Sequence, residues 1–186
     1  GPMAVEVTTV FDRCRQSSAK GTHELSKAGQ SPFDFLGLQL VESVEASKAI
    51  NLIKGSTIIM AGSGMITGGR IKHHLTMNIT HPESTLLFVG YQATGTLGRQ
   101  ILDGVSPVRI LGQFYPVRMK IEKIDAFSAH AGMNDLHRWL NNFKFPPKHV
   151  FLTHGEEESI LSLENYIQSK GGWEVSAPTY MEEHNL

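Results

Sequence analysis

The chain has 186 residues, and its 17 Lys and Arg against 18 Asp and Glu give a formal net charge of −1. With 40% hydrophobic residues, its composition is that of a soluble globular protein of one ordinary domain or two small ones. Because the net charge is near zero, the overall charge does not indicate nucleic-acid binding. A nucleic-acid partner would need a local basic patch on the surface.

The N-terminal half begins with two residues, Gly1-Pro2, that resemble the scar left when a protease removes an affinity tag. Residues 3–14 have helical spacing, and the polar stretch that follows predicts a short helix bounded by loops. A regular pattern then starts, in which Ser43 caps a predicted helix that Gly55 closes. The predicted elements of this part are a strand at 38–41, a helix at 44–53, a strand at 56–61, a loop at 62–69 and a helix at 70–79.

The same alternation continues to the end of the chain. The predicted elements are a strand at 84–91, a loop at 92–98, a short helix at 99–104, strands at 107–112 and 117–125, a helix at 133–143, a strand at 148–154, a helix at 156–172 and a strand at 173–178. Strands that alternate with helices predict parallel pairing and a layered α/β architecture. The apolar runs are far too short to cross a bilayer, so no membrane partner is expected. A single cysteine, Cys14, excludes an internal disulfide, and we therefore expect a cytoplasmic protein.

Four loops follow apolar strands and carry small residues: "MAGSGM", "VGYQATGTLG", "FSAHAG" and "LTHGE". Ligands of α/β sheets bind where the strands end, and small residues let a phosphate approach backbone amides. We therefore predict that Ser63 and Gly64 contact a phosphate with Arg70 as charge partner, and that Tyr91 stacks on a base while Arg99 contacts a backbone phosphate. A tight strand–helix turn is the plainer alternative for both glycine-rich loops. His73 and His74 point about 100° apart on a helix and are interpreted as a solvated or phosphate-facing helix end.

His130 and His154 each lie at the end of a predicted strand, facing one edge of the sheet. From the residues alone, a hydrogen-bonded structural role and a catalytic or metal-binding role stay open for both. Zinc takes about four ligands, at least three of them from protein in catalytic sites. The chain lacks the clustered His and Asp that would complete such a site.

The segments "IIMAGSGMITGGRIKHHL", "LLFVGYQATGTLGRQIL", "DAFSAHAG" and "LTHGEEE" resemble the β-CASP branch of the metallo-β-lactamase superfamily, and within it RNA-processing nucleases of bacterial and archaeal type. The resemblance implies a layered β-CASP domain at residues 3–125, with a mainly parallel sheet flanked by helices. It implies that residues 126–186 are the returning segment of a metallo-β-lactamase αββα domain. By this resemblance, His154 matches a ligand of the second of two zinc ions. His130 matches a catalytic residue that lies beside the scissile phosphate of single-stranded RNA.

The family's HxHxDH metal motif and its other upstream ligands are absent from residues 1–186. The resemblance therefore implies a C-terminal fragment of a zinc-dependent ribonuclease that is inactive alone, without the N-terminal metallo-β-lactamase part. Unpaired strand edges of a split domain would favour association, for example as a homodimer. Two alternatives are a non-catalytic RNA-binding paralogue and, outside the family, a nucleotide-binding regulatory domain.

Overall fold

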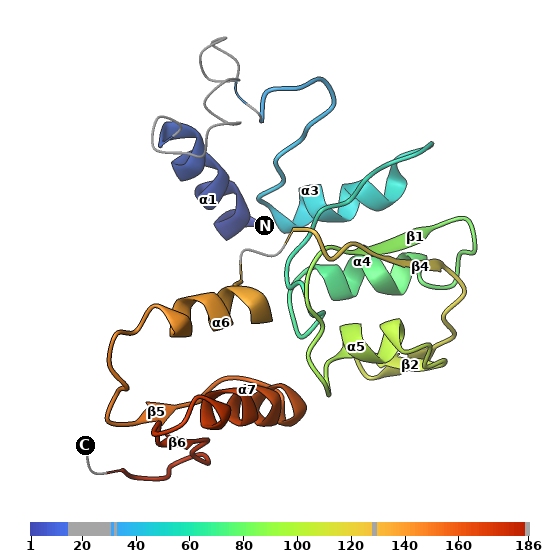
Figure 1. Cartoon of the computed structure of the whole chain (residues 1–186). Coiled ribbons are helices and arrows are strands. Elements are labelled where there is room, and N and C mark those ends of the chain that lie inside the picture. The colour runs from blue at the N-terminus through green and yellow to red at the C-terminus, as the bar shows by residue number, and fades with distance from the viewer. Residues whose placement is uncertain (15–30, 32, 128–129, 185–186) are drawn as a thin grey trace. The chain divides into compact units, whose positions relative to one another are not determined.

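The computed structural model describes residues 1–14, 31, 33–127 and 130–184 (Figure 1). The chain forms two compact units, Gly1–Phe127 and Ser128–Leu186, which we call the N-terminal unit and the C-terminal unit. The polar stretch at 15–30, where the sequence predicts a short helix between loops, lies outside the described residues. No helix of the described ranges is long and apolar enough to span a membrane.

Two helices of the N-terminal unit begin at residues whose hydroxyl groups cap the helix. Ser43 accepts a hydrogen bond from the Ala46 amide at 3.0 Å, and Thr96 accepts one from the Arg99 amide at 3.2 Å, so each hydroxyl satisfies an N–H that the first helical turn leaves unpaired. Gly55, with φ +98°, follows the second helical segment as predicted. The described helices of this unit are α1 (Pro2–Arg13), α3 (Val44–Ala49), the 3-10 helix η2 (Ile50–Leu52), α4 (Ile71–Asn78) and α5 (Leu97–Leu102).

Two small sheets complete the described part of the N-terminal unit. β1 (Thr85–Phe88) pairs in parallel with β4 (Lys120–Lys123), with Leu86 opposite Ile121. β2 (Val108–Ile110) and β3 (Gln113–Tyr115) form an antiparallel hairpin. The mixed α/β character expected from the sequence is therefore present, with one parallel and one antiparallel pair in this unit.

One apolar cluster joins α4 and α5 to the strands of this unit. Leu75 of α4, Ile79 directly after that helix, Ile101 of α5, and residues of β1 and β2 are each less than about 10% exposed and pack together. Burial of this kind supplies the main favourable free energy of folding. The buried members of the cluster are Ile66, Leu75, Ile79, Phe88, Ile101, Val108, Ile110 and Met119.

The C-terminal unit contains α6 (Met133–Asn141), β5 (Val150–Phe151), α7 (Glu157–Ser169) and β6 (Val175–Ser176). β5 and β6 pair in parallel, with Val150 opposite Val175. Glu157 and Glu158 lie in the first turn of α7, where negative charge suits the helix dipole. Leu140 and Ile167 are the buried hydrophobic residues among the described part of this unit.

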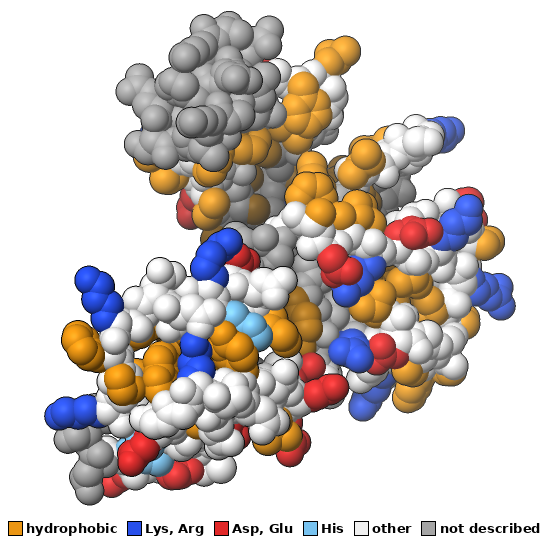
Figure 2. Space-filling view, in the orientation of Figure 1, with side chains coloured by type: hydrophobic (Ala, Val, Ile, Leu, Met, Phe, Trp, Pro, Cys, Tyr) orange, Lys and Arg blue, Asp and Glu red, His pale blue; other side chains and the backbone are white. Residues whose placement is uncertain are grey.

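The structure differs from the sequence prediction in its strands. Segments 38–41 and 56–61 were predicted as strands, yet neither pairs with a strand of the described ranges. A strand needs a partner ladder for its backbone N–H and C=O groups, and an apolar pattern does not supply one. Ile58 and Met60 of this segment are 89% and 76% exposed. Figure 2 shows hydrophobic side chains at the surface of the molecule. The β3 strand was not predicted.

Candidate functional site

The loop between segment 56–61 and α4 is compact because of its small residues. The Ser63 and Thr67 hydroxyls are hydrogen-bonded at 2.8 Å, and the Ile66 amide donates to the Ser63 carbonyl at 3.1 Å. Gly69 has φ +74°, and a Cβ there would lie 2.7 Å from the Gly62 carbonyl oxygen. Only glycine fits that position without strain. The predicted site residue Ser63 is half-buried in this loop, whereas Gly64 is exposed.

Gln92 connects this loop to the one after β1. Its side-chain amide donates to the carbonyls of Gly64 and Gly90, both at 3.1 Å, and the residue is only 3% exposed. Beside it, the Gly98 amide donates to the Met65 carbonyl at 3.1 Å, and a Cβ on Gly98 would come within 1.9 Å of the Gln92 side-chain oxygen. The two glycine-rich loops predicted to bind RNA are therefore held together as one structure.

A cleft of about 450 Å³ lies between the two loops. Its lining combines aliphatic side chains of β1 with the hydroxyls of Ser63, Thr67 and Tyr91 and the amide of Gln92. No charged side chain of the described residues lines it. The cleft is thus suited to a flat, neutral group such as a base, while contacts to phosphate there would have to come from backbone amides.

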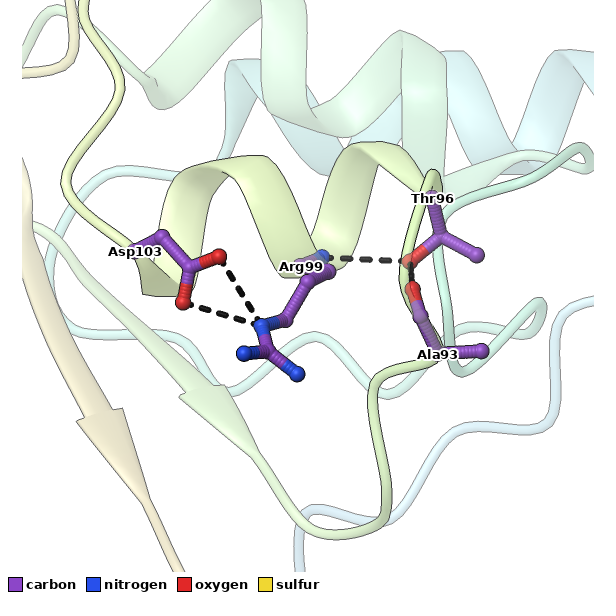
Figure 3. Close-up of polar contacts among 4 residues, drawn as sticks. All are labelled: Ala93, Thr96, Arg99 and Asp103. Atoms are coloured by element: carbon purple, nitrogen blue, oxygen red, sulfur yellow. Dashed lines mark hydrogen bonds and ion pairs between the residues drawn. The ribbon is translucent and has the colours of Figure 1, made fainter. Parts of the chain in front are cut away.

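The two arginines predicted to contact phosphate already bind protein atoms. The Arg70 guanidinium donates to the carbonyls of Val41 and Glu42, which ties segment 41–42 to the start of α4. Arg99 donates through Nε to both carboxylate oxygens of Asp103, at 2.9 Å each (Figure 3). The same figure shows Thr96 at the start of α5, bonded to the Arg99 amide and the Ala93 carbonyl. Tyr91, predicted to stack on a base, is 53% exposed at the cleft.

The adjacent histidines of α4 have different environments. His73 is exposed, as a solvated helix end requires. His74 is only 7% exposed, and its Nε2 lies 3.1 Å from the Ser47 hydroxyl, so of the two interpretations, a solvated or a phosphate-facing helix end, the solvated one was wrong for His74. Burial, followed by the charges of His73 and Arg70, lowers the pKa of His74 because the charged imidazole loses hydration beside other cations.

His130 lies on the exposed segment that leads into α6 of the C-terminal unit. Gly132 is the N-cap of this helix, and Asp135 accepts a hydrogen bond from the Gly132 amide at 3.2 Å. Asp135 also forms an ion pair with Arg138 at 2.6 Å. The carboxylate five residues after His130 is therefore used to fix the start of α6, and Asp125, five residues before His130, forms an ion pair with Lys123 at 2.7 Å. Ser128 and Ala129, which precede His130 in the predicted motif, lie outside the described residues.

His154 follows β5 and has the unusual backbone angle φ +66°. Non-glycine residues adopt positive φ infrequently, and such residues are common where function constrains the backbone. The residue is exposed, and α7 begins three positions later at Glu157. Gly155 fits tightly between them, because a Cβ there would lie 3.0 Å from a side-chain carbon of Ile160.

The prediction that both histidines follow strands of one sheet was wrong. β4, which precedes His130, pairs with β1, whereas β5, which precedes His154, pairs with β6. The described residues contain no group of three or more His, Cys, Asp or Glu side chains able to hold a metal. They therefore do not form a zinc site by themselves, although the exposed imidazole of His154 is a suitable single ligand for one.

Sequence reasoning missed Gln92 and the pair Ser47–His74. Gln92 stood inside a quoted loop, but nothing in its local pattern distinguishes a buried amide from a surface one. The partner of His74 lies 27 residues earlier, on a different helix. Only tertiary structure brings these groups together.

Two family models match the chain. The Beta-Casp domain matches residues 1–101, and the Zn-dependent metallo-hydrolase RNA specificity domain matches residues 115–178, which include His130 and His154. A ribonuclease of Thermus thermophilus, TTHA0252, is 40% identical over 97% of this chain and 41% of its own length.

Archaeal proteins are also similar. The transcription termination factor FttA of Methanosarcina mazei is 31% identical over 85% of this chain, and that of Pyrococcus abyssi is 30% identical over 88%. The chain spans less than half the length of each of these three relatives. With more than half of its residues matched by the Beta-Casp model, the chain belongs to the β-CASP family of the metallo-β-lactamase superfamily.

Proposed function

We propose that this chain is the C-terminal part of a metal-dependent ribonuclease that hydrolyses phosphodiester bonds of single-stranded RNA. The observation that carries the proposal is the order of the two matches, a Beta-Casp domain followed by an RNA specificity domain of metallo-hydrolases. The name of the Thermus relative, a ribonuclease, supports the same activity. In this proposal the layered β-CASP sheet and the αββα domain are complete only with residues outside this chain.

The roles proposed for the residues follow from chemistry. Zinc, when bound in the complete enzyme, would supply a hydroxide at neutral pH by lowering the pKa of a bound water. His154 would offer one neutral imidazole to the metal from its exposed turn. His130 would donate a proton to the leaving oxygen or stabilise charge at the phosphate.

The N-terminal unit would position the RNA strand in this proposal. Tyr91 at the uncharged cleft offers an aromatic face on which a base can stack, and the amides around Gly64 offer donors to a phosphate. The hydrophobic residues Ile58 and Met60 on the unpaired segment would favour pairing with a further strand, from the remainder of the protein or from a second copy.

Metal analysis and an RNA cleavage assay test this function. We expect the 186-residue chain to hold less than one zinc per molecule and to leave a single-stranded RNA oligonucleotide intact. We expect the protein encoded by the complete gene to bind zinc and cleave the same RNA. In that protein, His154→Ala should lower both zinc content and activity, whereas His130→Ala should lower kcat with zinc content unchanged.

The controls separate the proposal from its alternative. His137→Ala serves as a matched control, because that imidazole stacks on Tyr166 in α7 and has no proposed role in catalysis. Tight stoichiometric zinc and cleavage by the 186-residue chain would contradict the fragment interpretation. RNA binding by the complete protein without zinc or cleavage would establish the non-catalytic alternative instead.

A further inference from the structure

A second cavity of the N-terminal unit lies between α3 and α4, with a volume of about 320 Å³. None of the residues that line the cleft between the glycine-rich loops lines this one. Its walls come from α3 with η2 and from the first two turns of α4 with the residue before it. The lining residues are Val44, Ser47, Lys48, Asn51, Arg70, His73, His74, Thr76 and Met77.

The lining is positively charged. Lys48 and Arg70 carry full charges and His73 adds an exposed imidazole, while no carboxylate belongs to the lining. Ser47, Asn51 and Thr76 add neutral hydrogen-bonding groups. Arg70 donates to two backbone carbonyls but has five N–H groups, so donors remain for a ligand. This combination of donors suits an anion.

The start of α4 also favours an anion. Arg70, His73 and His74 of the cavity lining cluster at the N-terminal end, and the first turn contains no acidic residue. The helix dipole places positive partial charge at this end, so cations there are unfavourable and an anion would relieve them. Arg70, the N-cap residue, makes no side-chain cap bond, although its carbonyl accepts hydrogen bonds from the amides of His73 and His74 at 3.0 and 3.1 Å.

His74 forms a buried wall of this cavity. It is 7% exposed, its Nε2 is held by the Ser47 hydroxyl, and its Nδ1 has no hydrogen-bond partner among the described residues. Buried polar atoms normally have partners, and one without a partner needs an explanation, of which a bound group, an ion or a water is one. This atom is an observation independent of the charges.

We propose that the cavity between α3 and α4 binds a phosphate group of an RNA strand, at a place distinct from the cleft between the glycine-rich loops and from His130 and His154. Tetrahedral phosphate matches a cavity lined by cations and hydroxyl, amide and imidazole groups, and an RNA strand carries such groups both along its backbone and at its ends. The proposal rests on the proposed function only for RNA as the source of the phosphate.

Inorganic phosphate is the first probe, added to the 186-residue chain while the histidine ring signals are followed by NMR. We expect saturable shifts of the His73 and His74 signals. Lys48→Gln and His73→Gln should each raise the Kd for phosphate roughly tenfold, since a charge-assisted hydrogen bond contributes about 1.5–3 kcal/mol. Lys72→Gln is the matched control, because it removes a charge from the same helical turn but does not line the cavity.

The outcomes distinguish the site from a general effect of charge. An equal loss with Lys72→Gln, or the absence of saturable shifts, would overturn the proposal. Competition by RNA oligonucleotides with a 5′-phosphate, a 3′-phosphate or two hydroxyl ends then identifies the source. Preference for one phosphorylated end supports a terminal phosphate, equal competition by all three supports the backbone, and no competition overturns RNA as the ligand. No step requires RNA cleavage, so the result is independent of nuclease activity.

Discussion

The side-chain amide of Gln92 fixes the positions of the two glycine-rich loops relative to each other. One NH₂ group donates to carbonyls from both loops, Gly64 on one and Gly90 on the other. The surrounding space is filled to the point that Gly98 has no room for a methyl group beside it. The position of Ser63 and Tyr91 at the cleft therefore depends on the hydrogen bonds of Gln92.

We predict that Gln92→Leu lowers the free energy of unfolding by about 1–3 kcal/mol, because the leucine leaves two carbonyls without their donors. Urea denaturation monitored by circular dichroism measures the change. Gln100→Leu is the control, since Gln100 is exposed on the neighbouring helix α5 and its replacement should cost less than about 0.5 kcal/mol. Equal effects of the two substitutions would show that the Gln92 bonds contribute nothing to stability.

At the scale of single residues, the sequence indicated which side chains are exposed at a cleft or turn better than it indicated the hydrogen-bond partners of a side chain. Tyr91 is exposed at a cleft, as a stacking residue requires, and His154 is exposed on a constrained turn. The environments of Arg70 and His74 could not be predicted, because their partners lie 27 to 29 residues away on the chain. Periodicity identifies the face of a helix but not the hydroxyl or carbonyl that faces it.

Among the elements, helices were predicted more reliably than strands. A helix makes its hydrogen bonds within itself, so the Ser43 cap and the spacing of 44–53 were sufficient to place α3 and η2. A strand depends on a partner elsewhere, and segment 56–61 has a strand's composition without one in the described residues. The β2–β3 hairpin was missed because Leu111, with φ +48°, occupies a turn position where Asn is usual before glycine.

The junction between the first glycine-rich loop and α4 provides a prediction about an element. Gly69→Ala should lower the free energy of unfolding by about 1–3 kcal/mol, because alanine is strained at φ +74° and its Cβ would meet the Gly62 carbonyl. Gly68→Ala is a matched control one residue earlier, where φ is not positive and a Cβ meets nothing within 4 Å. Thermal unfolding of both variants measures the difference, and a Gly68→Ala effect as large as that of Gly69→Ala would refute the steric argument.

For the whole molecule, the two units differ in the core that each contains. The N-terminal unit has an extended cluster of buried aliphatic and aromatic side chains, whereas Leu140 and Ile167 are the buried hydrophobic residues described in the C-terminal unit. Several large apolar residues of the latter, including Trp139 and Phe145, are 61% and 81% exposed. Stability follows buried apolar area, so the unit that carries His130 and His154 is expected to be the less stable one.

This difference predicts separate opening of the two units. In native-state hydrogen exchange, the amides of α7 should exchange through an opening of lower free energy than those of α5. Ile167→Ala should speed exchange in α7 while leaving α5 unchanged, and Ile101→Ala should do the reverse, because each removes a fully buried side chain from one unit only. Opening of both helices with one common free energy, altered equally by either substitution, would show that the chain unfolds as a single cooperative domain. If the opening is separate, a protein segment or second copy that covers Trp139 and Phe145 should slow exchange in α7 specifically, because it would bury the apolar area that this unit exposes.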